Sequence, residues 1–139
     1  MKAIIRISGQ VNIPKIIEET LFRLRLRRKY TTIIIKECPE IKKLLLRIRN
    51  YVAYGDINNE TLKLLIQKRA VSKDKKRIDA ESVMEKLEKG LETDIKPFFR
   101  LHPPRGGIDA KKHFPTTKKA VLGDNKDKIN ELIRRMLWD

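Results

Sequence analysis

Hydrophobic and polar positions along the first 56 residues follow two alternating periods. Three short runs rich in β-branched and aromatic residues are typical of strands. Two segments between them repeat apolar residues at i, i+3, i+4 spacing, which is typical of amphipathic helices. We expect strands at residues 3–7, 31–35 and 51–54, and helices at 13–24 and 39–48. The apolar stripes comprise Ile13, Ile16, Ile17, Leu21 and Leu24 in the first helix, and Ile41, Leu44, Leu45 and Ile48 in the second.

The pattern changes after residue 57, where helices dominate. Asn58 and Asn59 are good N-cap residues for a helix that runs to about residue 69. Two more amphipathic stretches predict helices at 79–90 and 126–137. The chain therefore divides into a β-α-β-α-β core at 1–57 and a mainly helical extension at 58–139.

An irregular basic segment interrupts the extension at residues 101–124. It contains Pro and Gly, follows neither period, and comes directly after an aromatic anchor at Phe98 and Phe99. Irregular segments longer than about 12–15 residues inside a domain are usually functional or disordered. We therefore expect a long basic loop that reaches a partner.

Charge narrows the choice of partner. The 139 residues include 33 Lys and Arg against 18 Asp and Glu, a formal net charge of +15 at pH 7. Such an excess favours a polyanion, either nucleic acid or an anionic membrane surface. No apolar run approaches the ~20 residues that span a bilayer. The single Cys38 excludes an intramolecular disulfide and is typical of a reducing compartment. Composition therefore predicts a cytoplasmic, nucleic-acid-binding protein without a membrane partner.

The densest basic cluster lies at the end of the first predicted helix. It comprises Arg23, Arg25, Arg27, Arg28 and Lys29. Cations at a helix C-terminus complement the helix dipole, which accounts for one or two of them. A larger group is self-repelling unless phosphates neutralise it, and the planar guanidinium suits phosphate geometry. The cluster therefore predicts contact with nucleic-acid phosphates, with a solvated helix end as the alternative.

Three further basic groups are candidate contacts, although each also has the ordinary interpretation of a solvated surface. One lies on the outer face of the second helix, one in an exposed turn, and one in the long loop, where two glycines let the main chain approach a partner. They comprise Lys42, Lys43, Arg47 and Arg49; Lys75, Lys76 and Arg77; and Arg105, Gly106, Gly107, Lys111, Lys112, His113, Lys118 and Lys119.

Candidate catalytic and metal-binding chemistry is sparse. The chain lacks the GxxxxGK[ST] signature of a phosphate-binding P-loop. His102 and His113 are its only histidines, and neither has a neighbouring Cys or paired carboxylate. Asp109 and Asp124 stand alone, unlike the acidic cluster that would hold Mg²⁺. We expect no catalytic residue, cofactor, metal ion or small-molecule substrate. Basic surface with few aromatics favours the shape and phosphates of a folded RNA.

Several segments carry a more specific signal. They read LRLRRKY, KECPEIKKLLLRIRNYV, YVAYGDIN, IQKRAVSKDKKRID, FRLHPPRGG and INELIRRML. Together they resemble the L-thirty family of large-subunit ribosomal proteins in its long archaeal form, whose eukaryotic counterpart is L-seven. The resemblance implies an α+β fold with a three-stranded sheet, two helices on one face in a ferredoxin-like β-α-β-α-β arrangement, and a mainly helical C-terminal extension.

The same resemblance implies a function. The protein would be a structural component of the large subunit of the cytoplasmic ribosome, binding and stabilising folded ribosomal RNA beside neighbouring ribosomal proteins. The family's basic helix end falls at residues 23–29, and its PRGG loop falls at 104–107 with the lysines that follow. Two alternatives remain, a free-standing regulatory module that binds RNA or DNA and an RNA-processing enzyme.

Overall fold

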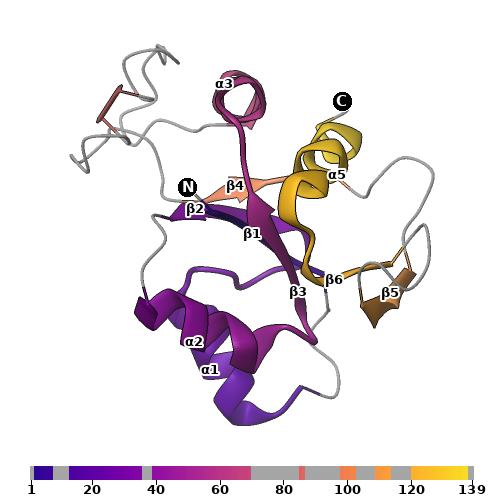
Figure 1. Ribbon diagram of the computed structural model, residues 1–139. Coiled ribbons are helices and arrows are strands. Elements are labelled where there is room, and N and C mark those ends of the chain that lie inside the picture. The colour runs from indigo at the N-terminus through magenta and orange to yellow at the C-terminus, as the bar shows by residue number, and fades with distance from the viewer. Residues whose placement is uncertain are drawn as a thin grey trace.

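The computed structural model describes residues 2–7, 13–35, 39–69, 85–86, 98–102, 109–113 and 120–137. It confirms the α+β class (Figure 1). The elements in chain order are β1 (Lys2–Arg6), α1 (Lys15–Arg23), β2 (Thr31–Ile35), α2 (Pro39–Ile48), β3 (Val52–Asp56), α3 (Asn59–Arg69), β4 (Phe99–Arg100), β5 (Asp109–His113), β6 (Ala120–Asp124), the 3-10 helix η1 (Lys126–Lys128) and α5 (Ile129–Met136). Within the helix expected at 79–90, the structure describes only residues 85–86, and these two are helical.

The three strands of the N-terminal part form the centre of the sheet. β1 pairs antiparallel with β2 on one side and with β3 on the other. Ile4 shows the register, because it lies opposite Ile33 of β2 and Tyr54 of β3. β2 and β3 are therefore parallel with β1 between them, and α2 connects them as in the split β-α-β unit of ferredoxin-like folds.

The sheet is larger than the three strands that we expected, because the C-terminal half adds strands at both edges. The strand order is β4-β2-β1-β3-β6-β5. β4 pairs antiparallel with β2, β6 lies parallel to β3, and β5 continues beyond β6 through an irregular pairing. The prediction of an irregular loop over 101–124 is therefore wrong for residues 109–113 and 120–124. The open edge of β3 supplies hydrogen-bond partners that the local pattern does not reveal.

Helices cover both faces of the sheet (Figure 1). Successive residues of β1 point to opposite faces. Ile4 packs with Leu21 of α1 and Leu45 of α2, whereas Ile5 packs on the other face in a cluster that includes α3 and Ile133 of α5. Fully burying one such side chain contributes about 1.5–3 kcal/mol. The sheet is thus the middle of three layers, and the prediction of two helices on one face is confirmed for α1 and α2.

Helix α1 buries a narrower stripe than its sequence predicts. Leu21 is fully buried, and Ile17 and Leu24 pack against the same cluster. Ile16 is 73% exposed, so its expected place in the core is wrong. Consecutive helical residues are separated by about 100° around the axis. Ile17 therefore takes the position facing the sheet, and Ile16 turns towards solvent.

Gly55 in β3 sets how closely the C-terminal helix approaches the sheet. A Cβ atom added at Gly55 would meet the backbone carbonyl oxygen of Lys126 and, at 2.9 Å, the Cβ of Ile129. The backbone oxygen cannot rotate away as a flexible side chain could. Any larger residue would therefore push η1 and α5 off the sheet.

Two asparagines join α5 to the start of α3. The side-chain oxygen of Asn130 accepts a hydrogen bond from the backbone N–H of Asn58 at 2.9 Å, and its amide donates to the backbone oxygens of Asp56 and Asp127 at 3.1 and 2.9 Å. The side-chain oxygen of Asn58 accepts from the N–H of Thr61 at 2.8 Å. Asn58 is therefore the N-cap that the sequence predicts for α3.

Candidate nucleic-acid interface

The turn after α1 gives the first basic cluster its shape. α1 ends at Arg23, and the N–H groups of Arg25 and Leu26 donate to the carbonyl oxygens of Phe22 and Leu21 at 3.0 and 2.9 Å. This pair of bonds is a Schellman motif, which requires a positive φ at the position of Arg25. Glycine usually occupies that position, but Arg25 adopts a φ of 65°. The left-handed conformation costs a residue with a Cβ about 1–2 kcal/mol. The fold therefore retains an arginine where glycine would be less strained.

A buried arginine stabilises this turn through hydrogen bonds. Arg6 of β1 is fully buried, and its Nη1 donates to the carbonyl oxygen of Leu26 at 2.7 Å. The backbone oxygen of Arg6 accepts from the N–H of Tyr30, also at 2.7 Å. Burial lowers the pKa of Arg6, and the carboxylate of Glu18 opposes that shift. The guanidinium stays charged, because arginine is not deprotonated in proteins. One residue thus fixes residues 26 and 30 through a charge-assisted bond and a backbone bond.

The cations of residues 23–29 lie on the surface of this fixed turn. Leu26, between them, is fully buried and belongs to the same cluster as Leu21, a hydrophobic contact that commonly accompanies a Schellman motif. Within the described part of the chain, Arg23, Arg25 and Arg28 form no ion pair with a carboxylate. The turn therefore presents a group of positive charges on an immobilised backbone.

A groove of about 540 Å³, here called the arginine groove, opens beside this turn. Because β4 pairs with β2, Arg100 lies opposite Thr31, far from it in sequence. The N–H of Leu101 also donates to the carbonyl oxygen of Tyr30 at 3.2 Å, which holds the two segments together. The lining comprises Phe22, Arg23, Arg25, Arg27, Arg28, Thr31, Phe98 and Arg100. Five of these residues are arginines and none is acidic.

Aromatic rings orient two arginines of the arginine groove. The Cζ of Arg27 lies 5.8 Å from the ring centroid of Phe22, and the Cζ of Arg100 lies 5.6 Å from that of Phe98. Such contacts contribute about 0.5–1 kcal/mol at exposed sites. A guanidinium stacked on a ring keeps the N–H donors along its edge available for a phosphate. The arginine groove therefore combines charge, planarity and fixed geometry.

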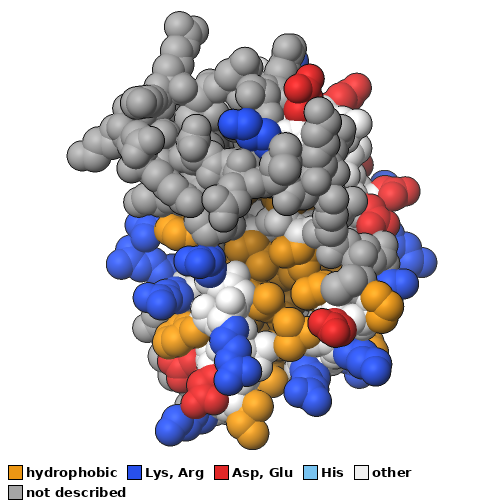
Figure 2. All heavy atoms as spheres, turned by 90° about the vertical axis from the view of Figure 1, so that its left-hand side faces the viewer, with side chains coloured by type: hydrophobic (Ala, Val, Ile, Leu, Met, Phe, Trp, Pro, Cys, Tyr) orange, Lys and Arg blue, Asp and Glu red, His pale blue; other side chains and the backbone are white. Residues whose placement is uncertain are grey.

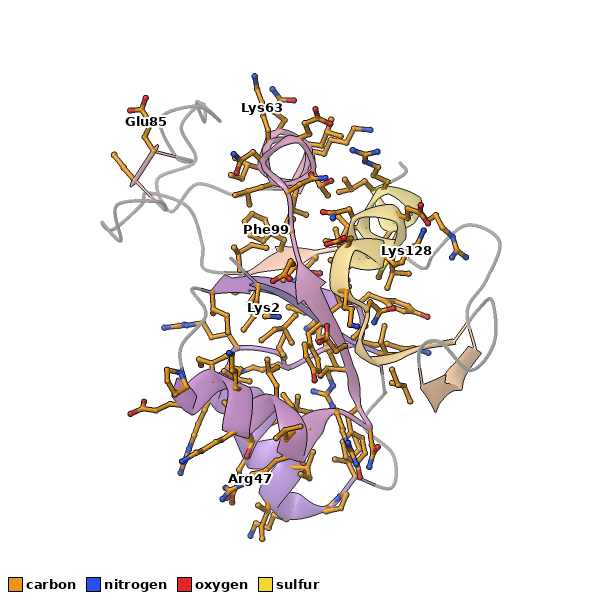
Figure 3. All side chains as sticks on the ribbon, in the orientation of Figure 1. Lys2, Arg47, Lys63, Glu85, Phe99 and Lys128 are labelled. Atoms are coloured by element: carbon orange, nitrogen blue, oxygen red, sulfur yellow. The ribbon has the colours of Figure 1, made fainter. Side chains whose placement is uncertain are left out.

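The second predicted basic group lies on α2 and on the residue that follows it, in the same helical layer as α1. It comprises Lys42, Lys43, Arg47 and Arg49, all of them exposed. In Figure 3, Arg47 points away from the sheet, on the opposite side of the molecule from Lys63 of α3. The lower half of Figure 2, where the α1–α2 layer lies, shows Lys and Arg side chains around hydrophobic ones, with fewer Asp and Glu side chains among them. These cations therefore extend the positive surface of that layer.

The remaining predicted contacts fall mostly beyond what the structure describes. Those outside the described residues are Lys75, Lys76 and Arg77; Arg105, Gly106 and Gly107; and Lys118 and Lys119. Lys111, Lys112 and His113 belong to β5, whose backbone pairs with β6 at the end of the sheet. These three lie on a strand and not in an irregular loop. As RNA contacts, all of these residues stay predictions.

Several residues that shape the arginine groove were not predicted as site residues. The sequence pattern joined Phe98 and Phe99 in one aromatic anchor, but the structure separates them. Phe99 is buried beneath α3 (Figure 3), whereas Phe98 packs against the opposite face of the sheet and lines the arginine groove. Phe22 and Arg100 carry no local signal of a site. Arg6 has a weak one, since it is a charged residue inside an apolar strand.

The described residues include no candidate metal site and no candidate membrane-spanning helix. No group of three or more His, Cys, Asp or Glu residues among them could hold a metal ion. No helix in the same part of the chain is long and apolar enough to cross a membrane.

Comparison with known proteins gives concordant matches. The family model described as ribosomal protein L30p/L7e matches residues 2–52. The large ribosomal subunit protein uL30 of Archaeoglobus fulgidus is 36% identical, over 98% of this chain and 99% of that protein. Proteins of the same name are 39% identical in Desulfurococcus amylolyticus, over 97% of each chain, and 35% identical in Sulfolobus acidocaldarius, over 96% of each. The similarity therefore covers both halves of the chain.

Proposed function

The chain belongs to the ribosomal protein L30p/L7e family, and we propose that it binds and stabilises folded ribosomal RNA as a structural component of the large ribosomal subunit. The relatives are named large ribosomal subunit proteins. The role is structural and not enzymatic, and its place is the cytoplasmic ribosome. The observation that carries the proposal is the arginine groove, whose described lining residues include five arginines and no carboxylate.

Phosphate neutralisation supplies the binding energy at this surface. Arg23, Arg25 and Arg28 project from a turn whose backbone is fixed before RNA arrives. Each phosphate that they neutralise releases condensed counterions, so affinity depends steeply on salt. A fixed turn loses little conformational freedom on binding, because its backbone is already ordered. The turn therefore acts as a preformed phosphate clamp.

The exposed face of the α1–α2 layer suits additional contacts in an assembled particle. Lys43 and Arg47 are one helical turn apart and both exposed, so they can follow one RNA backbone. Ile16 and Leu46 are 73% and 61% exposed and lie on the same layer. Apolar side chains that a free protein leaves exposed suit contact with neighbouring ribosomal proteins. The α1–α2 layer thus has exposed cations for RNA and exposed apolar side chains for neighbouring ribosomal proteins.

The proposal predicts how charge removal changes RNA affinity. Arg23→Ala combined with Arg28→Ala should weaken binding of the full chain to isolated large-subunit ribosomal RNA. It should also lower the slope of log affinity against log salt concentration by about 2, since each lost phosphate contact lowers it by about 1. The matched control is Lys63→Ala combined with Lys68→Ala on α3, which removes the same charge from the opposite layer. Filter binding across a salt series measures both slopes, and equal slopes for the two double variants would contradict the proposal.

Fractionation separates the ribosomal role from a free-standing regulatory one. Tagged chain in cell extracts should sediment with the large subunit on a sucrose gradient. A pool found only at the top of the gradient would favour the regulatory module. Metal-dependent cleavage of RNA by the purified chain would instead favour a processing enzyme.

A further inference from the structure

We propose that the arginine groove holds one unstacked nucleotide of the bound RNA, its base against the aromatic and guanidinium planes and its flanking phosphates on the arginines. This inference rests on the proposed RNA-binding function and names the feature that the groove recognises. Sequence-tolerant phosphate binding alone would require only a convex basic surface. The arginine groove differs from such a surface in shape, in lining and in rigidity.

The shape excludes a paired base as the occupant. The arginine groove is a hollow of about 540 Å³ between the end of α1 and the segment that leads into β4. That volume lies in the range of sites for small ligands, about 300–1,000 Å³. Bases in an A-form helix are stacked and paired, and proteins reach single bases where loops and bulges splay them out. Only a nucleotide that has left the stack can fill this hollow.

The lining matches a nucleotide better than a phosphate alone. Phe22 is 39% exposed, and Phe98 lines the same hollow from β4's side. An exposed phenylalanine ring offers a phosphate neither a positive charge nor a hydrogen-bond donor. A base, in contrast, stacks on an aromatic ring or on a guanidinium plane. Arg27 and Arg100 already lie over these two rings. A base can extend either stack while the remaining arginines hold the adjoining phosphates.

The frame around the hollow is fixed before binding. The carbonyl of Leu26 is held by Arg6 at 2.7 Å, and β2–β4 pairing holds Arg100 opposite Thr31. Both walls therefore keep their separation without RNA. An acidic peptide from a protein neighbour could pair with the arginines, but its carboxylates would not stack on the rings or on the guanidinium planes. The rings favour RNA.

The test compares two RNA hairpins that differ by one nucleotide. One is fully paired, and the other carries a single bulged 2-aminopurine, a fluorescent base that dims on stacking. The full-length wild-type chain should bind the bulged hairpin about 5- to 140-fold more tightly, the range expected for stacking one base. The fluorescence of the bulged base should fall on binding.

Two variants connect that preference to the arginine groove. Phe22→Leu removes one ring at an exposed helix position, and Arg100→Lys keeps the charge while removing the planar guanidinium. Each should reduce the preference for the bulged over the paired hairpin several-fold. The Lys63→Ala, Lys68→Ala double variant on α3 should keep the wild-type preference. Thermal unfolding of each variant verifies the fold.

Other outcomes would overturn the inference in distinguishable ways. Equal affinity for the two hairpins, with no change in fluorescence, would leave the proposed RNA-binding function intact and exclude a nucleotide in the groove. An acidic peptide with the same net charge as the hairpin serves as a competitor for the groove. If it displaced the bulged hairpin, the inference would be overturned, because the rings would then add nothing to RNA affinity. Failure to bind either hairpin or large-subunit RNA would overturn the proposed function together with the inference.

Discussion

The two helical layers of this protein use positive charge differently. In the α3–α5 layer, cations stand beside carboxylates: Arg134 lies 3.7 Å from Glu60, and Lys128 lies 3.7 Å from Glu131. In the α1–α2 layer, Arg23, Arg25, Arg27 and Arg28 line the arginine groove, and no acidic residue is among the described residues of that lining. Exposed ion pairs contribute only about 0–1 kcal/mol, so the paired cations give solubility more than stability. Among the described residues, Arg23, Arg25 and Arg28 form no ion pair with a carboxylate, which leaves their charges available to a phosphate.

The layers also differ in what fixes them. The α3–α5 layer is held by close packing at Gly55 and by the hydrogen bonds of Asn130. The turn after α1 is held by a buried charge, Arg6, and carries a strained residue, Arg25. Strain is retained where surrounding structure over-determines the backbone, which is common at functional sites. Lys126 of η1 also has a positive φ, 49°, so the two layers differ in the contacts that fix them and not in backbone strain alone.

Removing Arg6 should have the largest effect, because it acts on both properties of the α1–α2 layer. Arg6→Ala leaves the carbonyl of Leu26 without its partner and opens a cavity, which should cost about 2–5 kcal/mol in the free energy of unfolding. The affinity of the folded protein for large-subunit RNA should fall as well, since the turn loses its fixed shape. Chemical denaturation and filter binding below the unfolding transition measure the two effects.

A control on the same strand separates the turn from general loss of stability. Lys2 lies at the other end of β1 and pairs with Asp56 at 3.3 Å, an ion pair whose Asp56 side chain is 56% exposed. The Lys2 side chain itself is only 11% exposed, so Lys2→Ala should also lower the free energy of unfolding but leave RNA affinity unchanged. Arg6→Ala with normal RNA affinity would show that the turn keeps its shape without the buried arginine.

Gly55→Ala should act on the opposite layer alone. The added Cβ meets the backbone of η1 and the side chain of Ile129. Overpacking of this kind costs about 1–3 kcal/mol. RNA affinity measured on folded protein should match wild type, because the arginine groove lies on the other face of the sheet. A loss of affinity as large as that of the Arg23→Ala, Arg28→Ala double variant would contradict this separation of roles.

The elements that the sequence predicts well are those whose signal is local. The stripes of α1 and α2 and the β-branched runs of β1 and β2 lie within a few residues of one another, so period alone identifies them. β5 and β6 were missed, because Pro, Gly and Lys around them weaken the local pattern. The conformation of β6 depends on pairing with β3, where Ala53 lies opposite Gly123, and that of β5 depends on pairing with β6. The division of the chain at residue 57 stays a prediction.

The site shows the same limit. Charge density identified residues 23–29, because the cluster is contiguous in the sequence. The other wall of the arginine groove was missed, since Phe98 and Arg100 arrive only through the pairing of β4 with β2. The positive φ of Arg25 was also missed, because residue type predicts glycine or asparagine at that position. The sequence shows which side chains could bind RNA, and pairing between strands that are distant in the sequence brings those side chains together.

The smallest expected effect, and the sharpest contrast between the layers, belongs to Arg25. Arg25→Gly removes the strain of a left-handed conformation, which should raise the free energy of unfolding by about 1–2 kcal/mol. Glycine also gives the unfolded chain more conformational freedom, which lowers the same free energy by about 0.5–1 kcal/mol. The variant should therefore be as stable as wild type or up to about 1.5 kcal/mol more stable. Its RNA affinity should fall, and its salt slope should drop by about 1, the value for one lost phosphate contact.

Arg25→Asn completes the experiment. Asparagine tolerates positive φ and lacks the charge, so it should reproduce the lower salt slope without the extra flexibility of glycine. Denaturation and filter binding on the same preparations give stability and affinity together. If both variants bound RNA as wild type does, the strain at Arg25 would have no functional counterpart. If both bind more weakly at equal or higher stability, the α1–α2 layer exchanges stability for RNA affinity at this single residue.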